Sequence, residues 1–284
     1  MIRKLLQKYK HLFLFFIYKD VEQALKYSSL TKNSFEKRIQ LKYYDKIFSV
    51  PLSSSTISAM SKLEKNNEYL LIYKSLECPD IIFDIGTNIG YWIFPIVKEF
   101  NEYIQKVHCF EPSSINFEFL NKNLKNIKKI SLNNFGLSDE DSDAELGIPT
   151  WEKRTHNTGL FSVLSENSNK NEKIKLKKFD DLIIQKNSKN SYLFKIDVEG
   201  IEHKVLSGSE KFLSSDNKIS IIIELNKKID IHTDFNIDKS INFLSKNGFK
   251  PYKLLGKELI SISRDEIIAN LENHENYNFI FKNF

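Results

Sequence analysis

The segment from Asp84 to Gly90 constrains the fold of this chain more than any other segment. It follows the apolar run 81–83, carries glycines at positions 86 and 90, and precedes an amphipathic stretch that begins at Tyr91. A strand that runs through a glycine turn into a helix is how open α/β sheets bind ligands at the carboxyl ends of their strands. Glycines let the backbone approach the ligand closely, and a helix N-terminus follows. We therefore predict a ligand site at this turn; a purely structural turn is the alternative.

The rest of the chain predicts an α/β fold. From Cys78 onwards, short apolar runs alternate with amphipathic stretches, which is typical of repeated β-α units around a seven-stranded, mostly parallel sheet. We expect strands at Ile81–Ile85, Lys106–Phe110, Ile130–Asn133, Leu193–Asp197, Ile219–Glu224, Phe249–Leu254 and Tyr277–Phe281. We expect helices at Tyr91–Phe100, Ser114–Leu124, Ile201–Leu213 and Asp238–Asn247.

Residues 1–75 are predicted to form an N-terminal helical extension, and residues 76–284 the catalytic domain. Near the start, apolar residues recur at helical spacing and favour a core-packing helix. The apolar run 12–18 is shorter than the roughly 20 residues that span a bilayer, and no small-residue cleavage site follows it. Peripheral membrane contact is the alternative, because Lys4, Lys8, Lys10 and Lys19 surround an aromatic face.

Composition restricts the class of partner. The 42 basic residues are nearly matched by 37 acidic ones, and the net charge of +5 is modest for 284 residues. Nucleic acid is therefore not an expected partner, since the lysines are interpreted as solvated surface. Cys78 and Cys109 lie beside or within apolar runs and are interpreted as buried thiols, which suits a cytoplasmic location. The sequence leaves the oligomeric state open.

A second carboxylate indicates the class of ligand. The expected strand 106–110 ends at Glu111, about twenty residues after the glycine turn and directly before Pro112. A carboxylate there can accept both ribose hydroxyls of an adenosine. The spacing of Gly86 and Gly90 does not fit the G-x-G-x-x-G pattern of dinucleotide sites. Asp84 beside the turn would repel a pyrophosphate and attract the ammonium of a methionine moiety, so S-adenosylmethionine is favoured over NAD.

A third cluster, from Lys195 to His203, ends another expected strand and begins a helix. It brings acids and an imidazole to the rim where a methyl acceptor would sit. Asp197 is the first candidate for the base or the acceptor-orienting group, with Glu199 and His203 behind it. Glu202 has an alternative role as a stabiliser of the helix N-terminus. Nucleobase amino-methyltransferases generally place Pro-Pro-aromatic here, whereas acids suit a hydroxyl acceptor.

Two residues elsewhere are candidates for contact with the substrate. His156 lies in the long polar segment 147–173, which is expected to close over the site; a solvated loop histidine is the alternative. Glu224 ends an apolar strand at the same rim and is expected to hold a substrate hydroxyl. A divalent cation on Asp197, Glu199 and Glu224 is an alternative that the sequence does not demand, and no His/Cys cluster predicts zinc.

Six motifs in order resemble the FkbM family of methyltransferases across residues 81–225. They are Phe83–Gly90, Phe110–Pro112, Gly136–Asp139, Phe179–Leu182, Lys195–Glu202 and Val205–Ser209. The resemblance implies a class I Rossmann-like methyltransferase fold. It also implies O-methylation of sugars or other small hydroxyl compounds, commonly in polysaccharide, lipopolysaccharide or antibiotic pathways.

The resemblance also implies roles for individual residues. Asp84, Gly86, Asn88 and Gly90 would line the methionine part of the cofactor, Glu111 the ribose, and Ser138 with Asp139 the adenine. Thr87 stands where the family often has a smaller residue, and Pro112 completes the second motif. The N-terminal extension and the segment 151–164 match no motif, so the acceptor stays open. A nucleic-acid methyltransferase and a cofactor-binding scaffold without turnover remain the alternatives.

Overall fold

A computed structural model describes residues 17–18, 21–22, 24, 34–149, 168–182, 184, 187–230, 236–273 and 276–284. Within these residues, no helix is long and apolar enough to cross a membrane. Cys78 and Cys109 are free thiols, and Cys109 is buried. The lysine-flanked segment 4–19, apart from residues 17 and 18, and His156 lie outside the described residues.

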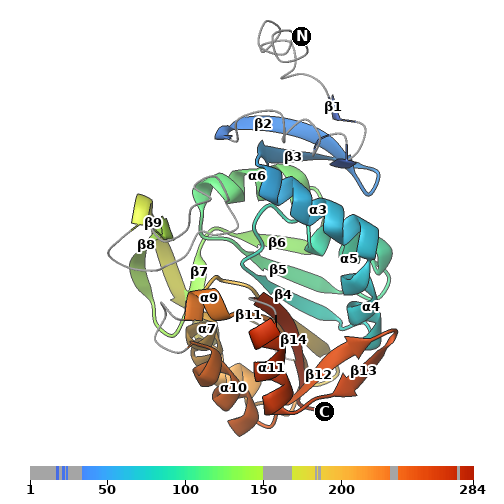
Figure 1. Cartoon of the computed structure of the whole chain (residues 1–284), viewed down its shortest axis with the longest axis vertical. Coiled ribbons are helices and arrows are strands. Elements are labelled where there is room, and N and C mark those ends of the chain that lie inside the picture. The colour runs from blue at the N-terminus through green and yellow to red at the C-terminus, as the bar shows by residue number, and fades with distance from the viewer. Residues whose placement is uncertain are drawn as a thin grey trace, which may run out of the picture.

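The centre of the molecule is an eight-stranded sheet in the order β13-β12-β14-β11-β10-β4-β5-β6 (Figure 1). The parallel strands are β4 (Ile81–Ile85), β5 (Lys106–Phe110), β6 (Ile130–Asn133), β10 (Ser191–Ile196) and β11 (Lys218–Asn226). The remaining strands are β12 (Lys250–Leu255), β13 (Glu258–Ser261) and β14 (Asn276–Lys282). Because β14 is antiparallel to both β11 and β12, β12 runs in the direction of the parallel set.

This topology confirms the predicted α/β fold with a mostly parallel sheet, as expected of a class I Rossmann-like methyltransferase. All seven predicted strands are present. The predicted number of strands was wrong by one, because β13 folds back on β12 as an antiparallel edge strand. Only four residues long, β13 has two half-buried and two exposed residues, so its sequence gives little strand pattern.

Helices cover the two faces of the sheet and form two hydrophobic cores. Strand residues such as Ile82 and Val107 pack in the first core with α4 (Glu68–Ser75), α5 (Ile93–Glu99) and α6 (Ser114–Leu124). Phe83 and Ile196 point to the second core, formed with α7 (Glu202–Gly208), α8 (Glu210–Leu213), α10 (Asn236–Lys246) and α11 (Arg264–Asn273). Adjacent strand residues serve opposite faces because side chains alternate along a strand.

The prediction that residues 1–75 are helical was wrong for part of this segment. The chain forms a three-stranded sheet from β1 (Ile17–Tyr18), β2 (Ser34–Tyr43) and β3 (Lys46–Leu52) before α3 (Ser54–Asn66) and α4. Residues 38–43 alternate between exposed and buried, with Ile39, Leu41 and Tyr43 inside. This period of two is the mark of a half-buried strand. Helix α3 begins after Ser53, whose side chain caps the helix by accepting a hydrogen bond from the Thr56 amide.

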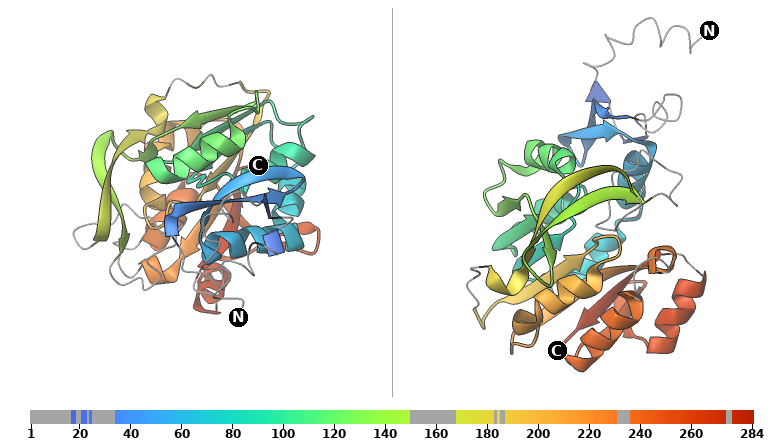
Figure 2. Two further views of the ribbon diagram at one scale, coloured as in Figure 1. Left: turned by 90° about the horizontal axis from the view of Figure 1, so that it is seen from above. Right: turned by 90° about the vertical axis from the view of Figure 1, so that its left-hand side faces the viewer.

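This N-terminal sheet packs against the elements that carry the glycine turn (Figure 2). Phe48 of β3 contacts Phe94 of α5, with ring centroids 5.0 Å apart. Buried Asn123 of α6 donates to the Ser49 and Ile89 carbonyls, at 3.0 Å each, and accepts from the Ser49 amide at 2.8 Å. Tyr43 donates to the Tyr91 carbonyl at 3.0 Å. Side-chain hydrogen bonds and aromatic packing therefore join the N-terminal sheet to the turn and to the helices that flank it.

A second small sheet, in the order β7-β9-β8, lies beside the central one (Figure 1). It consists of β7 (Gly136–Ser138), β8 (Ser142–Pro149) and β9 (Ser168–Lys178). The expected loop over 147–173 was therefore too long, because both of its ends are strand; residues 150–167 lie outside the described residues. The last residues of β9 are followed by a short 3-10 turn, η3 (Phe179–Asp181).

Candidate active site

The turn after β4 is shaped by residues with positive φ. Gly86, Asn88 and Gly90 have φ values of 82°, 56° and 88°. A Cβ added at Gly86 would lie 1.9 Å from the carbonyl oxygen of Asp197, and one at Gly90 would lie 2.7 Å from Leu124 Cδ1. Glycine at position 86 thus lets the turn after β4 touch the loop after β10, and glycine at position 90 lets α6 pack beneath it.

Every amide from residue 86 to residue 90 donates a hydrogen bond within the protein. The pairs are Gly86 to Phe110 O (3.0 Å), Thr87 to Phe110 O (3.1 Å), Asn88 to Glu111 Oε2 (2.8 Å), Ile89 to Asn88 Oδ1 (2.8 Å) and Gly90 to Thr87 O (3.1 Å). The buried Thr87 hydroxyl adds bonds to the Asp84 carbonyl and the Phe110 amide. Thr87 therefore links the turn to β5, and the amides of the turn already donate to acceptors within the protein.

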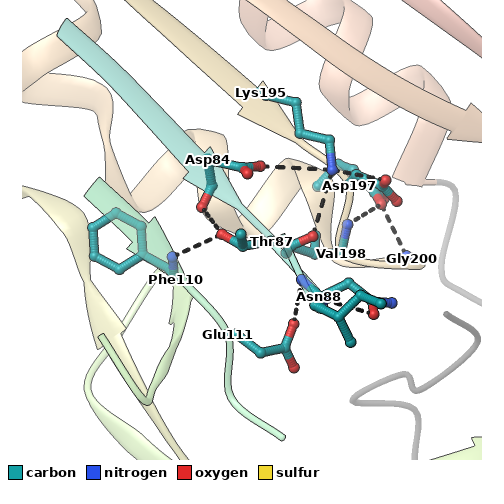
Figure 3. A network of polar contacts seen from close by, with 12 residues as sticks. Asp84, Thr87, Asn88, Phe110, Glu111, Lys195, Asp197, Val198 and Gly200 are labelled. Atoms are coloured by element: carbon teal, nitrogen blue, oxygen red, sulfur yellow. Dashed lines mark hydrogen bonds and ion pairs between the residues drawn. The ribbon is translucent and has the colours of Figure 1, made fainter. Parts of the chain in front are cut away.

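Asp84 and Lys195 form the buried centre of the site. Asp84 is 0% exposed, and neither of its carboxylate oxygens has a hydrogen-bond partner among the described residues. Lys195 Nζ lies 3.7 Å from Asp84 Oδ1, 2.9 Å from Asp197 Oδ2 and 3.4 Å from the Gly86 carbonyl (Figure 3). Burial raises the pKa of Asp84 to about 6; the Lys195 charge opposes this rise and the Asp197 charge adds to it.

Glu111 links the turn to the beginning of α6. Its Oε2 accepts from the Asn88 amide at 2.8 Å, and its Oε1 accepts from the Ser113 amide at 2.9 Å. Burial raises its pKa to about 7, and the backbone hydrogen bonds from Ser113 and Asn88 oppose this rise. A carboxylate oxygen can accept more than one hydrogen bond, so this arrangement leaves capacity for ligand hydroxyls. Pro112, half-buried, directly follows it.

The loop after β10 carries the acids predicted to serve the acceptor. Asp197 lies at the rim, with a side chain 27% exposed, and its amide donates to the Ile85 carbonyl at 3.0 Å. Glu202 is buried and accepts from the amides of Val198 and Gly200, at 3.4 and 3.0 Å. Glu202 thus stabilises the loop and the start of α7, in line with its alternative interpretation.

Glu199 and Glu224 stand close enough to influence one another. Glu199 has a positive φ of 56° and is half-buried. Burial, together with the charges of Glu224, Asp197 and Glu202, raises the pKa of Glu199 well above its ordinary value, and Lys195 opposes this rise. The protonated form of Glu199 is therefore favoured relative to an isolated glutamate. The structure brings Asp197, Glu199 and Glu224 together at one rim, as the sequence predicted.

Two residues in this cluster had no role predicted from the sequence, Tyr91 and Lys195. The pKa of Tyr91 is raised by burial and by the charges of Asp197, Glu224 and Glu199, which places its hydroxyl in the same electrostatic environment. Lys195 is a charged residue inside the otherwise apolar strand β10, and only 5% of it is exposed. A lysine within such a strand was the available signal, since buried lysines need charged partners.

The remaining predicted residues lie farther along the rim. His203, in the first turn of α7, is half-buried, and its charge lowers the pKa of Asp230, a carboxyl whose pKa burial raises. Ser138 is buried and donates to Asp139 Oδ1 at 2.9 Å; its carbonyl lies against Gly208 of α7. No group of three or more potential metal ligands occurs among the residues that the structure describes.

Comparison with known proteins places this site in a family. The sequence matches the Methyltransferase FkbM domain over residues 84–251, more than half of the chain. No curated protein matches it. The structure is similar to the methyltransferase FkbM from Methylobacillus flagellatus KT, with 14% identity and a TM-score of 0.44. That comparison covers 81% of this chain and 54% of the other, so this chain spans about half the length of that protein.

Two further solved structures are similar at comparable levels. The TYW2 of M. jannaschii, in complex with AdoMet, has 14% identity and a TM-score of 0.43 over 89% of this chain and 86% of that one. A geranyl diphosphate C-methyltransferase from Streptomyces coelicolor A3(2) has 10% identity and a TM-score of 0.42, with 80% of each chain covered.

The matched range contains the site described above, from Asp84 at the end of β4 to Glu224 in β11. The ordered motifs had predicted this family, and the match confirms it. This chain belongs to the FkbM methyltransferase family.

Proposed function

We propose that this protein transfers a methyl group from S-adenosylmethionine to a hydroxyl oxygen of a small molecule or glycan. One observation carries the choice of cofactor. The amides from residue 86 to residue 90 are all bonded within the protein, whereas Asp84 and Glu111 beside them retain acceptor capacity. A pyrophosphate needs free donors at such a turn. An ammonium and ribose hydroxyls need acceptors, so the residues fit S-adenosylmethionine better than NAD.

The binding roles follow from these contacts. Asp84 contributes negative charge beneath the turn, where it favours the ammonium of the methionine part. Glu111, held by two amides, accepts from the ribose hydroxyls. Ser138 and Asp139, beside α7, are proposed for the adenine end, and the half-buried Gly86 and Asn88 supply backbone contact surface.

The acceptor roles fall to the acids at the rim. The cofactor, when bound, supplies a methyl group activated by a sulfonium. As the new carbon–oxygen bond forms and the carbon–sulfur bond breaks, the hydroxyl proton must pass to a base. Asp197, partly exposed at the rim and paired with Lys195, is proposed to orient the hydroxyl and accept this proton. Glu199, whose raised pKa favours its protonated form, can in that form donate to a second acceptor oxygen, and Glu224 can accept from a neighbouring hydroxyl.

The charge of the rim supports an uncharged, hydroxyl-rich acceptor such as a sugar or a surface-polysaccharide precursor. The carboxylates of Asp197 and Glu224 would repel the phosphates of a nucleic acid, and the neighbouring cation Lys195 is buried. Nucleic-acid methylation is the second candidate, and steep salt dependence of RNA or DNA binding would favour it.

A methyl-donor assay on the purified chain tests this proposal. The panel contains sugar nucleotides, glycan fragments, RNA and DNA. We expect methylated product from a hydroxylated small molecule or glycan, and Asp197→Asn should reduce its formation by about 10² or more while S-adenosylhomocysteine affinity stays near that of the wild type. The exposed Asp216→Asn variant is the matched control. Transfer confined to nucleic acid, or cofactor binding with no transfer to any member of the panel, would contradict the proposal.

A further inference from the structure

Lys195 is a buried cation between the two halves of the site. It lies near the end of β10 and is 5% exposed. A buried ammonium is costly unless charged partners surround it. Lys195 has two, because its Nζ lies 2.9 Å from Asp197 Oδ2 and 3.7 Å from Asp84 Oδ1. Burial acts to lower the pKa of Lys195, but these two carboxylates raise it above its ordinary value.

The two carboxylates come from different segments, since Asp84 lies in β4 and Asp197 in the loop after β10. Asp84 lies beneath the turn proposed for the cofactor, and Asp197 lies at the rim proposed for the acceptor. Lys195 joins them and also donates to the Gly86 carbonyl at 3.4 Å (Figure 3). The end of β4 and the loop after β10 also touch through the backbone, because Gly86 packs on the Asp197 carbonyl and the Asp197 amide donates to the Ile85 carbonyl. The ammonium is thus the side-chain link across a contact that the backbone also makes.

The charges of Lys195, Asp84 and Asp197 do not cancel. One ammonium between two carboxylates leaves one net negative charge in a buried place. A ligand ammonium near the turn would compensate that charge, whereas removal of Lys195 would leave two carboxylates facing each other.

We propose that Lys195 is a positioning residue for the methyl transfer: its ammonium fixes the Asp197 carboxylate at the acceptor rim relative to the turn that holds the cofactor. The inference rests on the proposed function, since it assigns Lys195 a role in that reaction. Lys195 acts through Asp197 and Asp84.

The test variant removes the charge of Lys195 and keeps the approximate length of its side chain. Lys195→Met is compared with Lys195→Arg, which retains the charge, and with Lys253→Met, whose lysine forms a partly exposed ion pair with Glu266 at 3.8 Å. S-adenosylhomocysteine binding is measured by calorimetry from pH 5 to pH 8. Methylthioadenosine, which lacks the amino-acid part, is the control ligand. The titratable groups that face Lys195 and Asp84 are Tyr91, Cys109, Glu111, Asp197 and Glu199.

We expect wild-type affinity for S-adenosylhomocysteine to rise as the pH passes through about 6, because Asp84 then becomes charged. Methylthioadenosine, which keeps the ribose, should show only the later rise near pH 7 at which Glu111 becomes charged. Lys195 lowers the pKa of Asp84, so Lys195→Met should move the midpoint to higher pH and weaken binding at pH 7 about tenfold. Lys195→Arg and Lys253→Met should keep the wild-type midpoint. With the acceptor from the panel, Lys195→Met should reduce kcat more than it raises KM.

The outcomes separate the two proposals. A wild-type protein that binds no S-adenosylhomocysteine contradicts the proposed function itself. A wild-type protein that binds it, together with a Lys195→Met variant that keeps the wild-type midpoint and kcat, contradicts the role of Lys195 alone. If Lys195→Met does not fold, Lys195→Gln, which keeps a polar group beside Asp197, is titrated in its place, and a wild-type midpoint there also overturns the inference.

Discussion

Gly86 occupies a position where no side chain fits. A Cβ would overlap the Asp197 carbonyl, and φ is positive. Gly248 has a nearly identical φ of 80°, but a Cβ there would meet no atom within 4 Å. Gly248→Ala should therefore cost only the left-handed backbone penalty, about 1 to 2 kcal/mol. Gly86→Ala should lower the free energy of unfolding by clearly more, as measured by urea denaturation; equal losses would show that the contact between the two loops is not tight.

The raised pKa of Glu111 should make the stability of the protein depend on pH. Its pKa in the folded protein is raised from 4.5 to about 7, so between these values the folded state keeps a proton that the unfolded chain releases. The stabilisation is fully present below about pH 4.5 and is lost as the pH rises through 7. Between pH 4.5 and pH 7, the Tm of Glu111→Gln should fall by about 5 °C less than the Tm of the wild type.

The matched control is the exposed Glu140→Gln, which should follow the wild-type curve. The Tm of all three proteins is measured without ligand by differential scanning calorimetry. Parallel curves for the wild type and Glu111→Gln would refute the perturbed pKa of Glu111.

At the residue scale, sequence reasoning found side chains that end strands. Asp84, Glu111 and Asp197 stand at or directly after the ends of apolar runs, and parallel strands bring such ends to one edge. It did not find Lys195 as the centre of the site, because only the packing of β4 beside β10 puts Asp84 and Asp197 around one ammonium. It also could not show that the Thr87 hydroxyl, within the predicted ligand turn, bonds to backbone groups of β4 and β5.

At the element scale, the sequence predicted the central strands well because continuous apolar runs bounded by turns are distinctive. It missed β2 and β3, whose alternation of buried and exposed residues lies among many lysines and tyrosines. It also missed β8 and the first part of β9, where a polar composition indicated a loop. Pairing between these two strands supplies backbone hydrogen bonds that composition does not reveal.

Asn123 connects β3 to the glycine turn, and its loss should lower stability. This α6 side chain bonds to both Ser49 backbone groups and to the Ile89 carbonyl. Asn123→Ala leaves these groups without that partner and should lower the free energy of unfolding by about 1 to 3 kcal/mol. The exposed Asn121→Ala on the same helix should change it by less than about 0.5 kcal/mol. Equal effects in chemical denaturation would mean that the N-terminal sheet does not support the turn.

At the scale of the whole molecule, residues 34–75 are joined to the sheet by a shared core. Leu41 and Phe48 of the N-terminal sheet belong to the same hydrophobic cluster as Ile82 and Phe94. The proposed division at residue 75 therefore separates sequence motifs, and the packing crosses it. The motif-bearing range 84–251 carries the family match, while the N-terminal sheet lies outside that range.

The turn from Asp84 to Gly90, together with Glu111, is proposed to bind S-adenosylmethionine. Isothermal calorimetry of the full chain with S-adenosylhomocysteine and with NAD tests it most directly, and melting curves give the same comparison, because a ligand of the folded state raises Tm. We predict saturable binding of S-adenosylhomocysteine, weakened by about 1.5 to 3 kcal/mol in Glu111→Ala, and no binding of NAD. Binding of NAD without binding of S-adenosylhomocysteine would contradict the account.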